Sequence, residues 1–421
     1  MLEQKDQESI IGQGVRKSLK LPSKLRKDMI NKMYGAVLTG KKKIEYQEVG
    51  RPLVTDATDA IVKILATTVC GSDLHLYNGE LQMKYVQGYI LGHEAVGVVL
   101  DIGSEVKNIK KGDRVVISSI IACGSCEYCL KGQTSCCDFT NISKDRETQY
   151  GHNTGGIFGY SELVGGYDGL QAELARVPYA DVNLFKIPER VSDRQALMVS
   201  DIACTGYHGC ELADVKEGDN VVVFGCGPVG LMTQMWCKFR KANVVAIDVD
   251  QQRLNFAQQR IGVNIVNSKT QDPVEVINSL IPGGPDKVID CVGFRFPQDL
   301  LHKFERFLHL ESDSPNIVNA AIKMCKKNGR IALIGDYFGS VNHFNIGALM
   351  EKHLTISGGQ LWPHKYANKI FDLIQSEQID PSFVITHTFP LSQIAEVYRK
   401  FDAHEEGMIK CLIIPDELYK L

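Results

Sequence analysis

The chain has 421 residues, of which 44% are hydrophobic and 23% are charged, and its formal net charge is -3. A chain of this length can bury a large core, and two or three domains are expected at the usual domain size. The small net charge gives no long-range attraction for nucleic acid or an anionic membrane, and no apolar run reaches the roughly 18 residues of a membrane span. We therefore expect a cytoplasmic globular protein that acts on a small molecule.

Residues 1–33 are polar and include a basic cluster that begins at Arg16. A transit peptide is one interpretation of such a segment. Transit peptides contain few acidic residues, whereas Glu3, Asp6 and Glu8 precede the cluster. We expect a solvated extension that packs partly on the body of the protein.

From about residue 34, short β-branched runs alternate with Gly, Asp and Asn. This pattern predicts a small, irregular β-barrel. The clearest predicted strands are Ala60–Ala66, Ala95–Leu100 and Arg114–Ile117.

Within residues 120–140, four cysteines follow the spacing C-x2-C-x2-C-x7-C: Cys123, Cys126, Cys129 and Cys137. Two-residue gaps let a tight turn bring thiolates to one tetrahedral zinc ion. Disulfides are the alternative, but the chain has 13 cysteines, an odd number, and no secretory signal. We predict a structural zinc site, with Cys136 as the alternative fourth ligand.

After about residue 199 the pattern becomes a strand followed by a helix, repeated. This alternation predicts a parallel sheet with helices on both faces, an α/β domain. A polar stretch from Phe304 to Pro315 interrupts it, and we interpret this stretch as a surface insertion. The predicted strands are Asn220–Phe224, Asn243–Ile247, Lys287–Asp290, Arg330–Ile334 and Leu354–Ser357, and the predicted helices are Leu231–Phe239 and Gln252–Arg260.

A glycine motif, G-x-G-x-x-G, lies between the first of these strands and its helix. Its three glycines serve a tight turn, close approach of a pyrophosphate, and close packing of helix on strand. Asp248 ends the next strand, where a carboxylate accepts hydrogen bonds from the adenosine ribose and repels a 2′-phosphate. We therefore predict NAD as the cofactor rather than NADP. The motif residues are Gly225, Cys226, Gly227, Pro228, Val229 and Gly230.

Between the predicted barrel strands lie Cys70-Gly71-Ser72-Asp73-Leu74-His75 and Gly92-His93-Glu94. A buried cysteine or a single histidine is often a structural residue. The order of these two motifs, the four-cysteine lobe and the glycine motif, however, resembles the zinc-dependent medium-chain dehydrogenases over roughly residues 34–421. This resemblance implies that Cys70 and His93 bind a second, catalytic zinc, and that each chain holds two zinc ions.

The resemblance also implies the domain organisation. A GroES-like β-barrel catalytic domain is expected over residues 34–203, and a Rossmann domain with a doubly wound parallel sheet over 204–357. Residues 358–421 are expected to return to the catalytic domain. Family members are homo-oligomers, with a tetramer favoured over a dimer in the most similar subgroup.

The third ligand departs from the Cys2His set of the alcohol dehydrogenases. Asp201 stands at the family position before Thr205-Gly206-Tyr207, while Cys204 follows three residues later. An aspartate here resembles the glutathione-independent formaldehyde dehydrogenase subgroup. Glu94 is expected beside the metal, either as a transient ligand or in a buried salt bridge.

Further roles follow from the same resemblance. Ser72 is expected to bond the substrate oxygen and take its proton, and His75 to pass that proton towards solvent. The alternative for His75 is a surface histidine packed on Tyr77. The predicted cofactor contacts beyond the glycine motif are Thr205 at the nicotinamide, Val292 near the adenosine, Lys410 near the pyrophosphate and Arg253 across the adenine.

The implied activity is hydride transfer from a zinc-bound alcohol or aldehyde hydrate to NAD. A polyol or threonine dehydrogenase is the nearest alternative. The other is a catalytically silent nucleotide-binding relative, but such proteins lack the catalytic zinc ligands.

Overall fold

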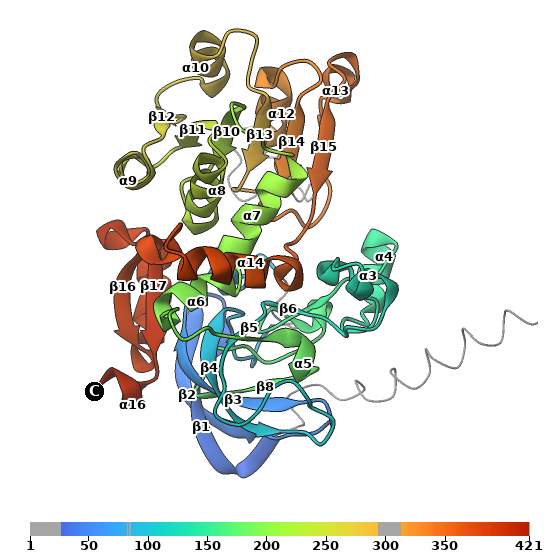
Figure 1. Ribbon diagram of the computed structural model, residues 1–421, viewed down its shortest axis with the longest axis vertical. Coiled ribbons are helices and arrows are strands. Elements are labelled where there is room, and N and C mark those ends of the chain that lie inside the picture. The colour runs from blue at the N-terminus through green and yellow to red at the C-terminus, as the bar shows by residue number, and fades with distance from the viewer. Residues whose placement is uncertain (1–26, 82, 84–85, 294–312, 421) are drawn as a thin grey trace, which may run out of the picture. The chain divides into compact units, whose positions relative to one another are not determined.

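The structure is a computed structural model that describes residues 27–81, 83, 86–293 and 313–420 (Figure 1). Two compact units are present. One combines the chain up to Asp201 with Trp362–Leu421, and the other is Ile202–Leu361. The expected extension therefore lies outside the described residues up to residue 26, but residues 27–33 belong to the first strand.

The first unit is built on a seven-stranded sheet in the order β16-β17-β3-β4-β5-β9, with β8 also pairing with β3. All its neighbouring strands are antiparallel except β16 and β17. The returning segment completes it, since Ile413 in β17 pairs with Thr67 in β3, and the red and blue strands lie side by side in Figure 1. The strands are β3 (Ala60–Thr67), β4 (Ala95–Ile102), β5 (Arg114–Ile117), β8 (Leu174–Val177), β9 (Leu184–Lys186), β16 (Ile385–Pro390) and β17 (Lys410–Ile414).

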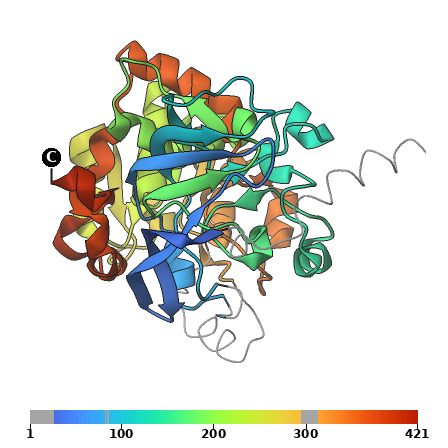
Figure 2. The ribbon, with the colours of Figure 1, turned by 90° about the horizontal axis from the view of Figure 1, so that it is seen from below.

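Two smaller sheets accompany it. The strands β1 (Lys27–Gly40) and β2 (Lys43–Pro52) form a separate antiparallel ribbon, drawn in blue in Figure 1 and Figure 2. The short strands β6 (Ile120–Ile121) and β7 (Gly156–Ile157) pair beside the cysteine lobe. The helices of this unit are α2 (Asp73–Tyr77), α3 (Glu127–Leu130), α4 (Lys144–Tyr150), α5 (Ala180–Asn183), α6 (Asp193–Val199), α14 (Pro363–Gln375), α15 (Ile394–Asp402) and α16 (Asp416–Tyr419).

Short 3-10 turns join several of these elements: η3 (Thr134–Cys136), η4 (Glu162–Val164), η5 (Pro381–Val384), η6 (Leu391–Gln393) and η7 (Glu405–Gly407).

The core of the barrel is a cluster of branched apolar residues from β3, β4 and β5, among them Val62, Ile64 and Val115, all completely buried. Burial of such side chains is the main stabilising term of the unit.

The second unit contains a six-stranded parallel sheet in the order β12-β11-β10-β13-β14-β15. Its central strands are nearly continuous apolar runs because helices cover both faces of a parallel sheet. The strands are β10 (Asn220–Phe224), β11 (Asn243–Asp248), β12 (Asn264–Asn267), β13 (Lys287–Asp290), β14 (Arg330–Leu333) and β15 (Thr355–Gly358), and the helices are α7 (Ile202–Leu212), α8 (Pro228–Phe239), α9 (Gln251–Ile261), α10 (Pro273–Leu280), α12 (Asn316–Met324) and α13 (Ile346–Glu351).

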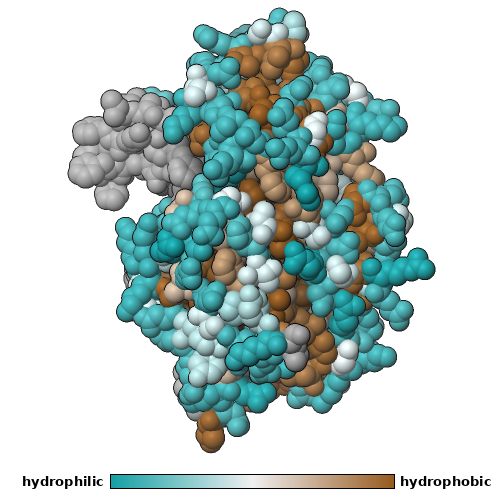
Figure 3. All heavy atoms as spheres, turned by 90° about the vertical axis from the view of Figure 1, so that its left-hand side faces the viewer, coloured by the Kyte–Doolittle hydropathy of each residue, from teal (hydrophilic) through white to brown (hydrophobic). Residues whose placement is uncertain are grey.

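The predicted barrel and parallel sheet are thus both present, and the strands predicted at Arg114–Ile117, Asn220–Phe224 and Lys287–Asp290 are confirmed to the residue. The predicted insertion at Phe304–Pro315 lies outside the described residues up to residue 312. Within the part of the chain that the structure describes, no helix is long and apolar enough to cross a membrane. Hydrophilic residues cover most of the face in Figure 3, with hydrophobic residues in smaller patches.

Candidate metal and cofactor sites

The four-cysteine lobe forms a cluster with the geometry of a metal site. The sulfur atoms of Cys123, Cys126, Cys129 and Cys137 all lie within 4.8 Å of one another. The backbone N–H groups of Ser125 and Cys126 each lie 3.4 Å from Cys123 Sγ, and such donors favour a thiolate. The donor set fits zinc.

The fourth member of this cluster is Cys137 and not its neighbour. Cys136 is exposed and lies outside the group, whereas Cys137 is completely buried. The turn at Gly124 has φ +75°, and a Cβ there would lie 2.6 Å from Val182 Cγ2, so the bend requires glycine.

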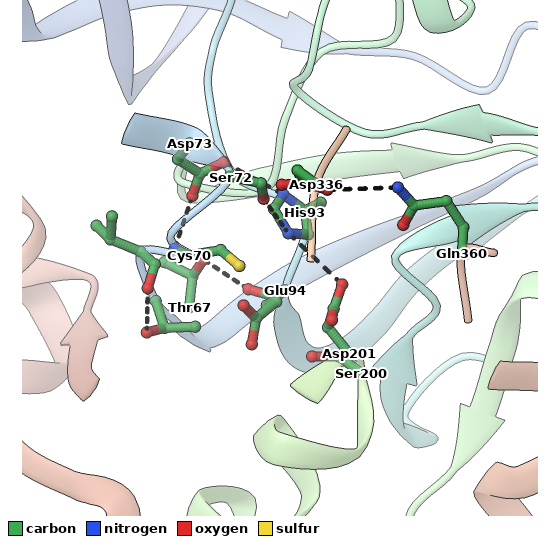
Figure 4. Close-up of polar contacts among 12 residues, drawn as sticks. Thr67, Cys70, Ser72, Asp73, His93, Glu94, Ser200, Asp201, Asp336 and Gln360 are labelled. Atoms are coloured by element: carbon green, nitrogen blue, oxygen red, sulfur yellow. Dashed lines mark hydrogen bonds and ion pairs between the residues drawn. The ribbon is translucent and has the colours of Figure 1, made fainter. Parts of the chain in front are cut away.

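A second cluster lies in the barrel unit, where the side chains point toward one another (Figure 4). Ligand atoms of Cys70, His93 and Glu94 lie within 4.8 Å of one another, and all three residues are buried. Asp201 Oδ2 lies 3.5 Å from His93 Nε2, and Ser72 Oγ lies 3.4 Å from the same nitrogen. A thiolate, an imidazole and a carboxylate around one point are a suitable donor set for zinc.

Local structure explains this convergence. Cys70 follows β3 at the turn into α2, and Ser72 is the N-cap residue of that helix. His93 and Glu94 directly precede β4, which pairs with β3, so the two ligand loops meet at one end of the sheet. Asp201 lies two residues after α6 and is the last residue of this unit before the chain enters the second unit.

Asp73 is a site residue that the sequence analysis missed. It is completely buried, its Oδ1 lies 3.2 Å from His93 Nδ1, and its Oδ2 accepts a hydrogen bond from the Cys70 backbone N–H at 2.9 Å. A carboxylate on Nδ1 leaves Nε2 of the histidine for a metal, as in carboxylate–histidine–zinc arrangements. Burial disfavours the charged imidazole, but Asp73 and Cys70 outweigh burial and raise the pKa of His93 well above its ordinary value.

Glu94 is held by Lys410. Lys410 Nζ donates to Glu94 Oε1 at 2.6 Å and to the Val69 carbonyl at 3.2 Å, and Lys410 is completely buried. Burial opposes the charged ammonium, but Glu94 and Cys70 outweigh it and raise the pKa of Lys410. The buried salt bridge that was one interpretation of Glu94 is therefore present. Lys410, which was predicted to lie near the pyrophosphate, lies beside the metal cluster. Its contact with the cofactor stays a prediction.

His75 is also buried, with 5% of its surface exposed. Its Nδ1 lies 2.5 Å from Glu80 Oε2, and Glu80 is itself partly exposed. His75 is therefore not the surface histidine of the alternative interpretation. Its contact with Glu80 connects a buried imidazole with a carboxylate that reaches solvent.

The glycine motif in the second unit joins β10 to α8 as expected for a phosphate-binding turn. Gly225 has φ +99°, Gly227 is the N-cap residue of α8 and Pro228 follows it as the first helical residue. A Cβ on Gly230 would lie 2.1 Å from the Gly225 carbonyl oxygen, so only glycine lets the helix pack this closely on the strand. Val229 is the second residue of the helix.

Of the other predicted cofactor residues in this unit, Asp248, Val292 and Arg253 lie near the glycine turn and Thr205 lies in α7. Asp248 Oδ2 accepts from the Cys226 backbone N–H at 2.6 Å, and Val292 Cγ2 is 3.1 Å from the position of a Cβ on Gly225. An Arg253 guanidinium nitrogen lies 3.7 Å from the position of a Cβ on Gly227, and its predicted contact with the adenine stays a prediction. Among the residues that the structure describes, the buried Nε of Arg253 has no hydrogen-bond partner. Thr205 is buried in α7.

Comparison with known proteins finds matches to both units of the chain. Residues 56–189 match the family model of the alcohol dehydrogenase GroES-like domain, and residues 228–303 match that of zinc-binding dehydrogenases. A zinc-type alcohol dehydrogenase-like protein of Schizosaccharomyces pombe is 38% identical over 90% of this chain and 90% of its own. A glutathione-independent formaldehyde dehydrogenase of Pseudomonas aeruginosa is 29% identical over 92% of this chain and 98% of its own. The solved structure of an alcohol dehydrogenase from Thermus sp. is 31% identical, has a TM-score of 0.77, and is matched over 91% of this chain and 100% of its own.

Proposed function

Since the chain belongs to the zinc-type alcohol dehydrogenase family, we propose that it transfers hydride from an alcohol or an aldehyde hydrate to NAD, with one catalytic and one structural zinc in each chain. The observation that carries the proposal is the buried cluster of Cys70, His93 and Glu94, together with Asp201, whose Oδ2 lies 3.5 Å from His93 Nε2. A catalytically silent relative has no need for such a set of ligands.

Cys70, His93 and Asp201 would hold the catalytic zinc, and Cys123, Cys126, Cys129 and Cys137 the structural one. A zinc ion with three protein ligands acts as a Lewis acid that lowers the pKa of a hydroxyl group bound in its fourth position. Asp73 holds His93 through Nδ1 and so keeps Nε2 directed into the cluster.

We propose a route for the proton through this chain's own side chains. Ser72 Oγ lies beside His93 Nε2, at the place where a substrate hydroxyl would enter. We assign Ser72 to accept the hydroxyl proton and His75 to pass it on, with Glu80 orienting the His75 ring through Nδ1.

The cofactor is assigned as NAD on the strength of Asp248. Its carboxylate is fixed by the backbone N–H groups of Cys226 and Asp250, at 2.6 Å and 2.9 Å, at the end of β11. A fixed negative charge there repels a 2′-phosphate and accepts hydrogen bonds from ribose hydroxyls. The glycine turn, together with Arg253, Thr205, Val292 and Lys410, is assigned to the remaining cofactor contacts.

For the substrate we propose formaldehyde, as its hydrate, or a short alcohol. The support is Asp201 as the carboxylate ligand and the similarity to the Pseudomonas aeruginosa formaldehyde dehydrogenase. A polyol or amino-alcohol dehydrogenase of the same family is the second candidate. We also propose a homo-oligomer, which size-exclusion chromatography with light scattering tests.

Steady-state NADH formation tests this assignment. Zinc-replete protein is mixed with NAD and, separately, formaldehyde, ethanol, a longer primary alcohol and a polyol. The proposal predicts the highest kcat/KM with formaldehyde. Turnover of alcohols alone would retain the chemistry and reject the aldehyde, and turnover of polyols alone would favour the second candidate.

A further inference from the structure

Gln171 joins the two loops that carry the proposed metal ligands. Its side chain is completely buried, its Nε2 donates to the Thr68 carbonyl at 3.0 Å, and the same nitrogen lies 3.4 Å from Asp73 Oδ2. Thr68 lies just before Cys70 and Asp73 just after it. One amide therefore contacts the Cys70 loop on both sides of the ligand.

The backbone of the same segment holds the other loop. Gln171 N–H donates to the Leu91 carbonyl at 3.0 Å, and Leu170 N–H donates to the Gly92 carbonyl at 2.9 Å. A Cβ on Gly92 would lie only 2.5 Å from Gln171 Cγ, so this side chain packs directly on the turn that precedes His93.

Tyr398, in α15, fixes which way the Gln171 amide faces. Both groups near Nε2, a carbonyl and a carboxylate, accept hydrogen bonds, so the amide nitrogen must face them and Oε1 must face away. Tyr398 Oη donates to Oε1 at 2.9 Å, and Tyr398 is completely buried. The tyrosine sits 227 residues away along the sequence, in the segment that returns to the barrel unit.

We propose that Gln171 is a positioning residue that holds the Cys70 and His93 loops at the separation the catalytic metal requires, with Tyr398 orienting its amide. The inference rests on the proposed function, because it concerns the same metal site. It acts through Asp73, which links Gln171 to His93 Nδ1. Loss of the Tyr398 hydroxyl leaves Oε1 buried without a donor and frees the amide to turn.

The test compares Tyr398→Phe and Gln171→Met with wild type, all as zinc-replete full-length protein. Tyr89→Phe is the matched control, since Tyr89 is also buried and its hydroxyl donates to Glu162. One readout is the rate at which zinc passes to a chromogenic chelator, and another is the visible spectrum of the cobalt-substituted protein. Partners behind metal ligands typically change metal affinity by about 10- to 100-fold. We expect zinc release to rise on the order of 3- to 10-fold for Tyr398→Phe and further for Gln171→Met, with altered cobalt bands in both.

Wild-type rates and spectra in Tyr398→Phe would overturn the inference, and so would equal acceleration in Tyr89→Phe. If Gln171→Met does not fold, the conservative Tyr398→Phe still decides. Wild-type protein with only one bound zinc would instead overturn the proposed function. If the wild-type protein binds two zinc ions and both variants release zinc at the wild-type rate, the proposed function stands and only the role of Gln171 is rejected.

Discussion

Lys410 Nζ lies 2.6 Å from Glu94 Oε1, and both side chains are almost completely buried, at 0% and 1% exposed. A buried ion pair depends on both partners, because removal of one leaves an uncompensated charge away from water. We predict that Lys410→Met lowers the free energy of unfolding by about 3–5 kcal/mol. Urea denaturation measures this.

The double variant Lys410→Met/Glu94→Gln is the control for that result, because it removes both charges. It should recover much of the lost stability. A Lys410→Met protein of wild-type stability that shows only a raised KM for NAD would assign Lys410 to the cofactor alone.

Asp201 is predicted to be the third ligand of the catalytic zinc. Asp201→Ala should reduce bound zinc from two ions to one per chain, because two protein ligands hold the metal too weakly. Asp201→Cys should retain both ions but slow the chemical step, since a softer thiolate makes the metal less electrophilic. Metal analysis and the kinetic isotope effect of a deuterated alcohol measure the two effects.

Cys204, the alternative third ligand, supplies the comparison. Cys204→Ser should keep both zinc ions. Loss of one ion from Cys204→Ser, together with retention in Asp201→Ala, would reverse the assignment.

The two adjacent cysteines of the lobe give a matched pair for the structural site. Cys137→Ser should lose the structural zinc and lower the free energy of unfolding by more than about 4 kcal/mol, as loss of a metal site does. Cys136→Ser should change neither quantity. Metal content and thermal denaturation of the two variants, compared side by side, check this, and an equal effect of both substitutions would contradict it.

His364, in α14, links the returning segment to the cysteine lobe. Its Nε2 donates to Asn183 Oδ1 at 3.0 Å, and its Nδ1 lies 2.9 Å from Thr134 Oγ1. Burial lowers the pKa of His364 from its ordinary 6.5 to about 4. Between pH 6.5 and 4 the His364 side chain is therefore protonated in the unfolded chain but stays neutral in the folded protein. The free energy of unfolding falls by up to about 3 kcal/mol as the pH falls through this range.

The variant His364→Gln tests this pH dependence. It should be less stable than wild type at neutral pH but lose less stability on acidification. The control His387→Gln, at a partly exposed histidine, should follow wild type. Parallel curves for wild type and His364→Gln between pH 7 and pH 5 would contradict the assignment of this loss to His364.

Asp248 is predicted to set the cofactor preference. Asp248→Ser should raise the ratio of kcat/KM for NADP to that for NAD by at least about tenfold, because a fixed like charge beside a phosphate is costly. Asp272→Ser, at the N-cap of α10, removes a comparable carboxylate and should leave the ratio unchanged. An unchanged ratio in Asp248→Ser would place the discrimination elsewhere.

Local patterns account for what was predictable. Runs such as Arg114–Ile117 and Asn220–Phe224 are rich in β-branched residues and are followed directly by Ser or Gly. The sequence therefore predicts both the strand and the residue at which it ends. The ligand clusters were predictable because spacing and motif order carry the information. The ribbon of β1 and β2 was not predicted, since β1 has no regular alternation and its pairing is irregular between Asp28 and Lys32.

Asp73, Gln171 and Tyr398 were missed for a different reason. The residue type and the local sequence of each give no sign of burial at a metal site, and their role depends on partners distant in sequence. The contact of Gln171 with Asp73 spans 98 residues, and its contact with Tyr398 spans 227. Only the folded barrel brings them together.

The most direct test of hydride transfer follows the label itself. Zinc-replete protein is incubated with NAD and an alcohol or formaldehyde deuterated on the reacting carbon, and the reduced cofactor is analysed by mass spectrometry. The account predicts deuterium in the product NADH and none in the same experiment with Asp201→Ala. Protein with two bound zincs that forms no labelled NADH from any alcohol, polyol or aldehyde would contradict it.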